Sequence, residues 1–286
     1  MGEEPEKIEE TKPTAEINLE EFNKPEILPV YSLDGKIVGK VEVPKIFIST
    51  PIRPDVVKRA VLAIQSRRFQ PKGRDPMAGK RTTAESRGVG LGIARIPRVK
   101  GAGTPRAGQG AFAPGTVGGR LAHPPTPEKI IIKRINKKEK KLALKSALAA
   151  TTKKDLVEKR GHKVEDVFRL PIIVEDEIEE VKNTRKLRDV LKALKLEKEL
   201  ERIVEGRRIR AGKGKGRGRR IKQAKGPLFI VNEDRGIVKA ASNLPGVDVA
   251  TTKNLNVELL APGTHLGRLT IWSESAFKEV GGLLTK

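Results

Sequence analysis

The second half of the chain alternates short apolar runs with stretches in which apolar residues recur every three or four positions. Four runs have the length of buried strands: PIIV (171–174), LFIV (228–231), VDVAT (247–251) and LTIW (269–272). Helical spacing predicts helices between and after them: 187–203 with a stop at Gly206, 236–243, 256–261 and 273–284. Buried strands that alternate with helices are typical of a parallel sheet covered on both faces. We therefore predict an α/β fold with Rossmann-like layers and a mostly parallel central sheet.

The first half of the chain predicts a hairpin, one further strand and three helices. PVYSL (29–33) and KIVGKVEV (36–43) flank Asp34 and Gly35, which favour a type I′ turn because that turn needs a positive φ at both central residues. IFIS (46–49) is a further strand candidate. The predicted helices are 54–68, which places Val57, Ala60, Val61 and Ile64 on one side; 137–151, which opens with the cap signature Asn136 to Glu139; and 155–161, which ends at Gly161.

A long interruption separates these helices. Residues 66–125 contain 12 Gly, 7 Pro and 12 Lys or Arg, but only two acidic residues, Asp75 and Glu85. Gly and Pro block a helix, and no apolar alternation of strand length is present. A structureless segment of this length inside a domain is typical of a functional or disordered loop. We predict an extended basic loop over 69–125 that becomes ordered against phosphates and is disordered in the free protein.

The distribution of charge along the chain defines two further segments. The chain has 286 residues and a formal net charge of +23, but residues 1–26 hold nine Glu and three Lys. Residues 206–226 hold ten basic residues, six Gly and no acidic residue. We therefore divide the chain into a disordered acidic tail (1–28), a globular α/β domain in two parts (29–68 and 126–286) and the basic loop (69–125), with 206–226 as a second basic segment.

Several functional classes find no support. The absence of Cys excludes disulfides, Cys-ligated zinc and a cysteine nucleophile, and the three His lie at no metal-binding spacing. No apolar run reaches the length of a membrane span, and the N-terminus has no signal sequence. The glycines around Gly206–Gly214 and Gly88–Gly92 fail the spacing of nucleotide-binding loops. We expect no catalytic residue, no metal and no cofactor; Ser273 is predicted as a helix N-cap and Trp272 as a core residue.

The basic segments indicate RNA. Arg-rich, Gly-rich irregular chain suits folded RNA better than the major groove of DNA, because it can enter crevices and fold on binding. We expect no membrane contact and no homo-oligomer. The predicted RNA-binding residues are Arg67, Arg68, Arg74, Lys80, Arg81, Arg87, Arg95, Arg98, Lys100, Arg106, Arg120 and His123 in the loop, and Arg207, Arg208, Arg210, Lys213, Lys215, Arg217, Arg219, Arg220 and Lys222 in the second segment.

Four stretches resemble a known family. They are GIARIPRVKGAGTPRAGQGAF (92–112), GGRLAHPP (118–125), INKKEKKLALKSALAAT (135–151) and LNVELLAPGTHLGRLTIWSESAF (255–277). Together they resemble large-subunit ribosomal protein four in its archaeal and eukaryotic form, over about residues 28–286. The compact length suits the archaeal version. Residues 1–26 fall outside the family pattern.

The resemblance implies a structural constituent of the large ribosomal subunit that binds 23S-type rRNA early in assembly and contacts several rRNA domains and neighbouring ribosomal proteins. It implies a cytoplasmic protein whose loop threads through rRNA and lines the exit tunnel beside the nascent polypeptide. The tunnel-lining tip would comprise Ile93, Arg95, Ile96, Pro97, Arg98 and Lys100. The alternative left open by the residues alone is an RNA-modifying enzyme or RNA chaperone with a Rossmann-like core and basic appendages.

Overall fold

The structure is a computed structural model, and it describes residues 26–285. Residues 1–25 of the predicted acidic tail lie outside the described part of the chain. The boundary that we drew at residue 28 is two residues too late, because Ile27 already begins the first strand and Leu28 is buried.

A six-stranded sheet forms the centre of the globular part, in the order β2-β1-β3-β8-β6-β7. Its strands are β1 (Ile27–Tyr31), β2 (Ile37–Glu42), β3 (Ile172–Val174), β6 (Leu228–Val231), β7 (Asp248–Thr251) and β8 (Thr270–Ser273). Only the edge pair β1–β2 is antiparallel, and every other neighbouring pair is parallel. The predicted mixed α/β fold with a mostly parallel sheet is therefore confirmed.

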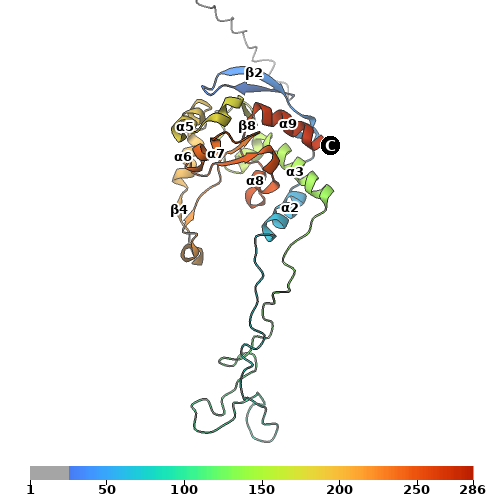
Figure 1. Cartoon of the computed structure of the whole chain (residues 1–286), viewed down its shortest axis with the longest axis vertical. Helices are drawn as coiled ribbons and strands as arrows, with labels where there is room; N and C mark the ends of the chain where they lie inside the picture. The colour runs from blue at the N-terminus through green and yellow to red at the C-terminus, as the bar shows by residue number, and fades with distance from the viewer. Residues whose placement is uncertain (1–25, 286) are drawn as a thin grey trace, which may run out of the picture. The chain divides into compact units, whose positions relative to one another are not determined.

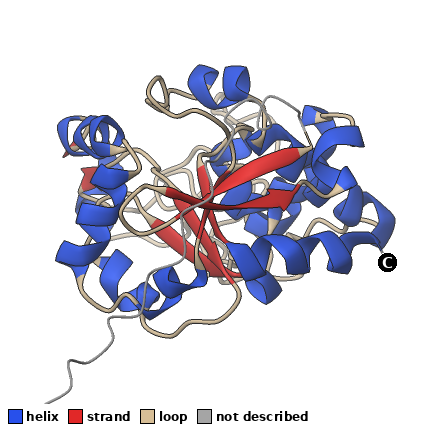
Figure 2. Cartoon of the chain, turned by 90° about the horizontal axis from the view of Figure 1, so that it is seen from above, coloured by secondary structure: helices blue, strands red, loops and turns tan. Residues whose placement is uncertain are grey.

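Helices cover both faces of this sheet, as the view in Figure 2 shows. They are α1 (Lys45–Ser49), α2 (Pro54–Ser66), α3 (Lys137–Thr151), α4 (Lys154–Lys159), α5 (Thr184–Ala193), α6 (Glu197–Glu205), α7 (Ile237–Ser242), α8 (Val257–Leu260) and α9 (Glu274–Thr285). Short 3₁₀ turns add η2 (Asp176–Glu180), η4 (Thr252–Asn254) and η5 (Pro262–Thr264).

Strand residues alternate between two cores. On one face, Ile172, Phe229 and Ile271 pack in an aliphatic cluster with residues of α5, α6 and α7. On the other face, the fully buried Trp272 meets the rings of Phe47 and Phe277 at centroid distances of 5.9 and 5.6 Å. The apolar runs of β3, β6 and β8 are continuous because these strands are buried on both faces.

The strand predicted at 46–49 is wrong, because these residues form helix α1. Ile46 and Phe47 are both buried, while Ile48 is 47% exposed. A strand would have placed Ile46 and Ile48 on the same face. The Phe47 ring packs against Trp272 and Phe277, and these contacts favour a helix over a strand here. The local sequence pattern does not reveal them, because they join residues far apart in the chain.

The predicted hairpin is confirmed, but its turn is not type I′. The Ser32 carbonyl accepts from Gly35 N at 3.0 Å, and Ser32 N donates to the Lys36 carbonyl at 2.8 Å. The loop therefore has three residues, and only Gly35, with φ at +79°, has a positive φ. A Cβ on Gly35 would lie 2.5 Å from the Ala193 carbonyl oxygen, so the turn and its contact with α5 both need glycine.

Helix α3 begins at the predicted residue without the predicted cap bond. Asn136 occupies the N-cap position, but its side chain forms no capping hydrogen bond. Glu139 pairs with Arg59 of α2 at 2.9 Å instead of returning to the cap. The sequence signature thus marked the helix start correctly, while the acidic side chain ties two helices together.

The described chain separates into two compact units. The first contains the described residues up to Leu62 and from Ile135 onward, and the second contains residues 63–134. Residues 67–134 form no helix and no extended strand, and only isolated bridges join Glu85 to Arg98 and Arg98 to Gly110. None of the described helices is long and apolar enough to cross a lipid bilayer.

Candidate nucleic-acid interface

The segment 206–226 forms a short two-stranded ribbon rather than an unstructured loop. β4 (Arg208–Ile209) pairs with β5 (Ile221–Lys222) in an antiparallel register, and the 3₁₀ turn η3 (Lys213–Arg217) closes the far end. We call residues 206–226 the basic ribbon. Gly212 and Gly218 flank η3 with φ near +78° and +77°, which lets the chain reverse around it.

Most cations of the basic ribbon are free to meet a partner. Arg210 and Lys225 are the exceptions. Arg210 Nε donates to the Arg219 carbonyl at 3.0 Å and holds the two strands together, and Lys225 pairs with Asp248 at 2.9 Å. Eight other cations are exposed and form no side-chain hydrogen bond or ion pair with any described residue: Arg207, Arg208, Lys213, Lys215, Arg217, Arg219, Arg220 and Lys222. The ribbon thus presents a dense positive charge that no acidic side chain within it neutralises.

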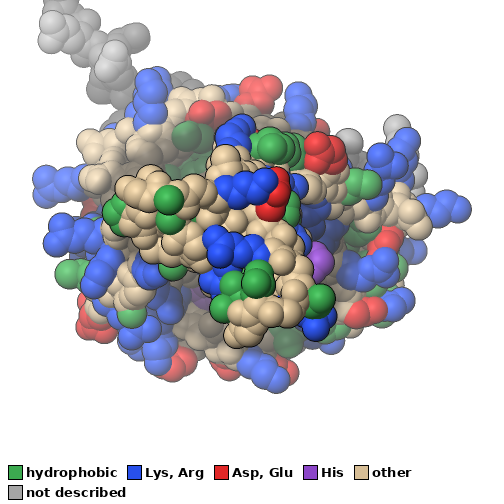
Figure 3. All heavy atoms as spheres, turned by 90° about the horizontal axis from the view of Figure 1, so that it is seen from below, with side chains coloured by type: hydrophobic (Ala, Val, Ile, Leu, Met, Phe, Trp, Pro, Cys, Tyr) green, Lys and Arg blue, Asp and Glu red, His purple; other side chains and the backbone are tan. Residues whose placement is uncertain are grey.

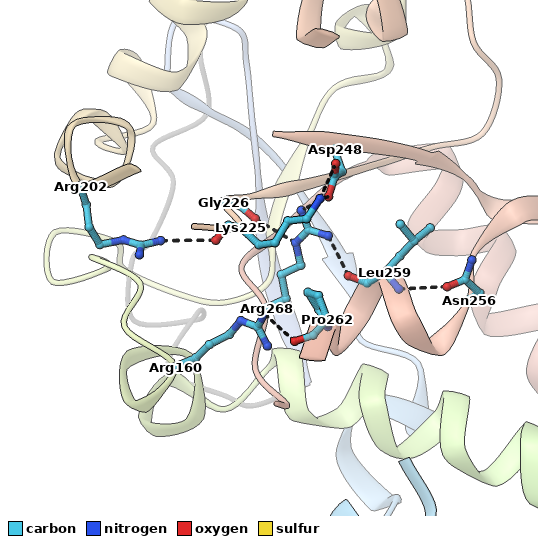
Figure 4. A network of polar contacts seen from close by, with 9 residues as sticks. All are labelled: Arg160, Arg202, Lys225, Gly226, Asp248, Asn256, Leu259, Pro262 and Arg268. Carbon is cyan, nitrogen blue, oxygen red and sulfur yellow. Dashed lines mark hydrogen bonds and ion pairs between the residues drawn. The ribbon is translucent and has the colours of Figure 1, made fainter. Parts of the chain in front are cut away.

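A buried arginine fastens the root of the basic ribbon to the sheet. Arg268 precedes β8 and is fully buried. It donates to the Gly226 carbonyl at 2.8 Å, the Leu259 carbonyl at 2.9 Å and the Asp248 carboxylate at 2.6 Å (Figure 4). Burial alone would raise the pKa of Asp248, but the charges and hydrogen bonds of Arg268 and Lys225 outweigh burial and lower it. Sequence reasoning missed Arg268, because a single Arg before a strand carries no pattern.

We expect Arg268→Met to lower the free energy of unfolding by about 2–3 kcal/mol, because two carbonyls lose their donor and Asp248 loses its buried partner. Urea unfolding measures the change. Lys225→Met is the control, since it removes only the exposed partner of Asp248 and should cost less than about 1 kcal/mol. Equal stability of the two variants would contradict this role of Arg268.

The second unit is an extended loop whose two arms lie side by side (Figure 1). A Cβ on Gly79 would lie 2.4 Å from the Gly119 carbonyl oxygen, and one on Gly73 would lie 3.0 Å from Pro127. Gly79 has φ at +76°, so both its backbone conformation and this close approach need glycine. The glycines that prevented helix prediction therefore also let the arms meet.

Three stretches of the loop are tied together near its end, and we call this the loop knot. Glu85 and Arg98 exchange backbone hydrogen bonds of 3.0 and 2.9 Å. The Pro97 carbonyl accepts from Ala111 N at 2.9 Å, and Val99 N donates to the Gln109 carbonyl at 3.0 Å. Residues 86–95 and 100–107 leave the knot as two separate excursions, which form the tip of the loop.

The knot separates the predicted tip residues into two kinds. Ile93 and Arg95 are exposed on the first excursion, whereas Ile96, Pro97 and Arg98 are half-buried in the knot. Arg98 Nη1 donates to the Gly108 carbonyl at 2.8 Å, and Lys100 pairs with Glu85. Arg95 on the first excursion and Arg98 in the loop knot therefore present their guanidinium groups from different parts of the loop.

The remaining predicted loop residues also differ in their surroundings. Arg81 pairs with Asp75, Arg68 is exposed just after α2, and Arg120 is half-buried. Exposed side chains without a hydrogen bond or ion pair to any described residue are those of Arg67, Arg74, Lys80, Arg87, Arg95, Arg106 and His123. Figure 3, which views the molecule from the side of Figure 1's lower edge, shows Lys and Arg side chains spread over this face.

The carboxyl ends of the strands, where α/β enzymes often bind ligands, are crossed by internal hydrogen bonds. The buried Glu179 accepts from Ser273 Oγ at 2.9 Å and from Asn232 N at 2.7 Å. Ser273 also accepts from Ala276 N at 3.4 Å, as expected of an N-cap. Within residues 26–285, no group of three or more His, Asp or Glu side chains is placed to hold a metal ion.

Comparison with known proteins adds independent evidence. The model of the ribosomal protein L4/L1 family matches residues 41–283. The large ribosomal subunit protein uL4 of Methanosphaera stadtmanae is 51% identical over 257 residues, covering 90% of this chain and 97% of that protein. The uL4 proteins of Sulfurisphaera tokodaii (51% over 248 residues, 86% and 91% covered) and Pyrobaculum aerophilum (49% over 259 residues, 90% of each chain) are similarly close.

Proposed function

Because this chain belongs to the ribosomal protein L4/L1 family, in its archaeal form, we propose that its basic ribbon and its extended loop bind large-subunit rRNA. Membership makes the chain a cytoplasmic structural protein of the large ribosomal subunit and not an enzyme. The alternative of an RNA-modifying enzyme is therefore set aside.

One observation carries the proposal of RNA binding. The two basic segments expose many cations without acidic partners, while the two acidic residues of the loop are each paired within it, Asp75 with Arg81 and Glu85 with Lys100. Exposed guanidinium and ammonium groups on glycine-rich chain neutralise RNA phosphates and displace counterions. The layered sheet with helices on both faces supports our classification of the globular domain (29–68 and 126–286) as Rossmann-like, with the loop (69–125) as its appendage.

We further propose that the protein binds 23S-type rRNA early in subunit assembly, touching several rRNA domains and neighbouring ribosomal proteins. Crosslinking in cells, followed by sequencing of the attached RNA, tests this directly. We expect the reads to map mainly to large-subunit rRNA, with peptides from both basic segments carrying the adducts. Adducts dominated by other RNAs would contradict the proposal.

The finer proposal is that the loop tip lines the nascent-polypeptide exit tunnel, with Ile93 and Arg95 as its exposed residues. Ser86 Oγ lies 3.4 Å from the Arg95 carbonyl oxygen, so the ends of the first excursion are close together. Residues 87–95 can therefore be replaced by two glycines without cutting the loop knot. We expect such subunits to assemble, because the knot, the arms and the basic ribbon remain.

Translation in these subunits should respond differently to arrest peptides and to small molecules that occupy the tunnel, because steric and cationic surface is lost. Arg95→Gln should give part of this change, and Arg106→Gln, on the other excursion, is the matched control. Normal arrest and normal drug sensitivity in fully assembled subunits would exclude the tunnel role of this excursion.

A further inference from the structure

A groove with a volume of about 550 Å³ lies at the root of the basic ribbon, on the globular unit. Lys159, Arg160, Arg202 and Lys225 contribute four cationic side chains to its lining, and none of the described residues that line it is acidic. The volume lies within the range of about 300–1,000 Å³ that is typical of ligand sites. The groove is therefore a positively charged hollow large enough for a ligand.

Arg160 is a half-buried cation of this groove that has only backbone carbonyls as partners. It follows helix α4 and donates through Nη2 to the Pro262 carbonyl at 3.2 Å and through Nη1 to the His265 carbonyl. Within the described part of the chain it has no carboxylate partner. A guanidinium has five N–H donors, so three remain for a ligand.

Positively charged side chains near Arg160 favour the binding of an anion beside it. Arg202 binds the buried Glu199 at 2.8 and 2.7 Å and also approaches the Lys225 carbonyl, and Arg268 lies behind them. Figure 4 shows that Arg160 reaches the Pro262 carbonyl, Arg202 the Lys225 carbonyl, and Arg268 the partners described above. Burial, together with the charges of Arg268 and Arg202, lowers the pKa of Arg160 from its usual range to about 10, so the guanidinium stays charged at neutral pH.

We propose that this groove binds a phosphate group of an RNA strand, with Arg160 and Lys159 as its principal contacts. The proposal rests on the proposed rRNA-binding function and adds a contact on the globular unit to those of the ribbon and the loop. The planar fork of Arg160 suits the oxygens of a phosphate.

The surroundings of the groove favour RNA as the source of this phosphate. Lys225 belongs to the basic ribbon, and Arg202 touches its carbonyl at 3.4 Å, so the positive surface runs from the ribbon into the groove without interruption by an acidic lining residue. The exposed His265 and the adjacent Leu266 also line the groove. An imidazole ring beside an anion site offers a face on which a base can stack.

The first test is the salt dependence of binding between the full chain and a transcript of large-subunit rRNA. Arg160→Gln and Lys159→Gln should each reduce the slope of log K against log salt by about 0.7, the value for one lost phosphate contact. Arg185→Gln, at an exposed position of helix α5, removes the same charge elsewhere and should leave the slope unchanged. Two groove variants with the wild-type slope would overturn the proposal.

The second test identifies what occupies the groove. A photoreactive benzoylphenylalanine at Leu266, in the full chain within assembled subunits, should form an adduct with rRNA. An adduct with a protein, or none, would overturn the proposal in favour of a protein partner or an empty groove. Arg160→Gln could weaken binding by destabilising the fold, which a lowered melting temperature would reveal. In that case the salt slope of Lys159→Gln and the crosslinked adduct test the proposal, because Lys159 is exposed and makes no hydrogen bond or ion pair among the described residues.

These outcomes distinguish rRNA binding by the whole protein from phosphate binding in the groove. A full chain that fails to bind the transcript at all would refute the proposed function itself. Binding that weakens on substitution of the ribbon arginines but not of Lys159 or Arg160 would leave that function standing and refute only the groove.

Discussion

Replacing five arginines of the basic ribbon by Ala is expected to weaken binding to large-subunit rRNA by about 10²–10³-fold near 0.1 M salt. The five are Arg207, Arg208, Arg217, Arg219 and Arg220, all exposed and without a side-chain hydrogen bond or ion pair to the described residues. Each lost phosphate contact removes about 0.7 from the slope of log K against log salt, so the slope should fall by up to about 3.5. Filter binding across a salt series measures both quantities.

The control removes the same number of charges from another surface. It changes five exposed cations of the globular unit to Ala: Arg185, Lys186, Arg188, Lys239 and Lys253. This variant should lose little affinity, because only long-range attraction is reduced. If the ribbon variant and the control behaved alike, binding would depend on net charge and not on the ribbon. Arg210 is left intact in both proteins, because it holds the two ribbon strands together.

Ile173→Asp is expected to abolish stable folding of the globular unit. Ile173 is fully buried in the middle of β3, between Val30 of β1 and Trp272 of β8. An Asp there would bury a carboxylate with no partner, at a cost of more than about 4 kcal/mol, which is a large part of the stability of an ordinary domain. Circular dichroism and thermal melting should show loss of the cooperative transition.

Ile173→Val is the matched control, because it removes one methylene and adds no charge. It should cost about 0.5–1.5 kcal/mol and keep a cooperative transition. An Ile173→Asp protein that melts like this control would mean that β3 is not buried on both faces. That result would contradict the sheet order on which the fold rests.

The sequence predicted the sheet well because its signal is local. The runs around β3, β6 and β8 are apolar on both faces, and each lies within one residue of its predicted position. Helix α1 could not be found in the same way, since contact between Phe47 and Trp272 joins residues far apart in the chain. The predicted turn type at Gly35 was wrong, because hairpin signals in a sequence identify the turn residues better than they identify the length of the loop.

Prediction of the interface was limited in a different way. Composition located both basic segments, but it treated every cation in them as equivalent. Whether an arginine faces a ligand or holds the chain depends on backbone geometry, as Arg98 in the loop knot and Arg210 in the ribbon show. Arg160 and Arg268 lie outside the basic segments, and only the fold brings them to the root of the ribbon.

The loop knot has a consequence for how the protein enters and leaves a particle. Two excursions spread from the knot, while the arms behind it lie against each other at Gly79 and Gly119 (Figure 1). A broad head on a narrow stem cannot be pushed into a crevice that has already closed, nor withdrawn from one. If RNA closes around the stem, as the proposed function implies, it would trap the protein mechanically, whatever the strength of its individual contacts. Exchange of bound for free protein would then require the surrounding RNA to unfold, so its residence time would equal the lifetime of the particle.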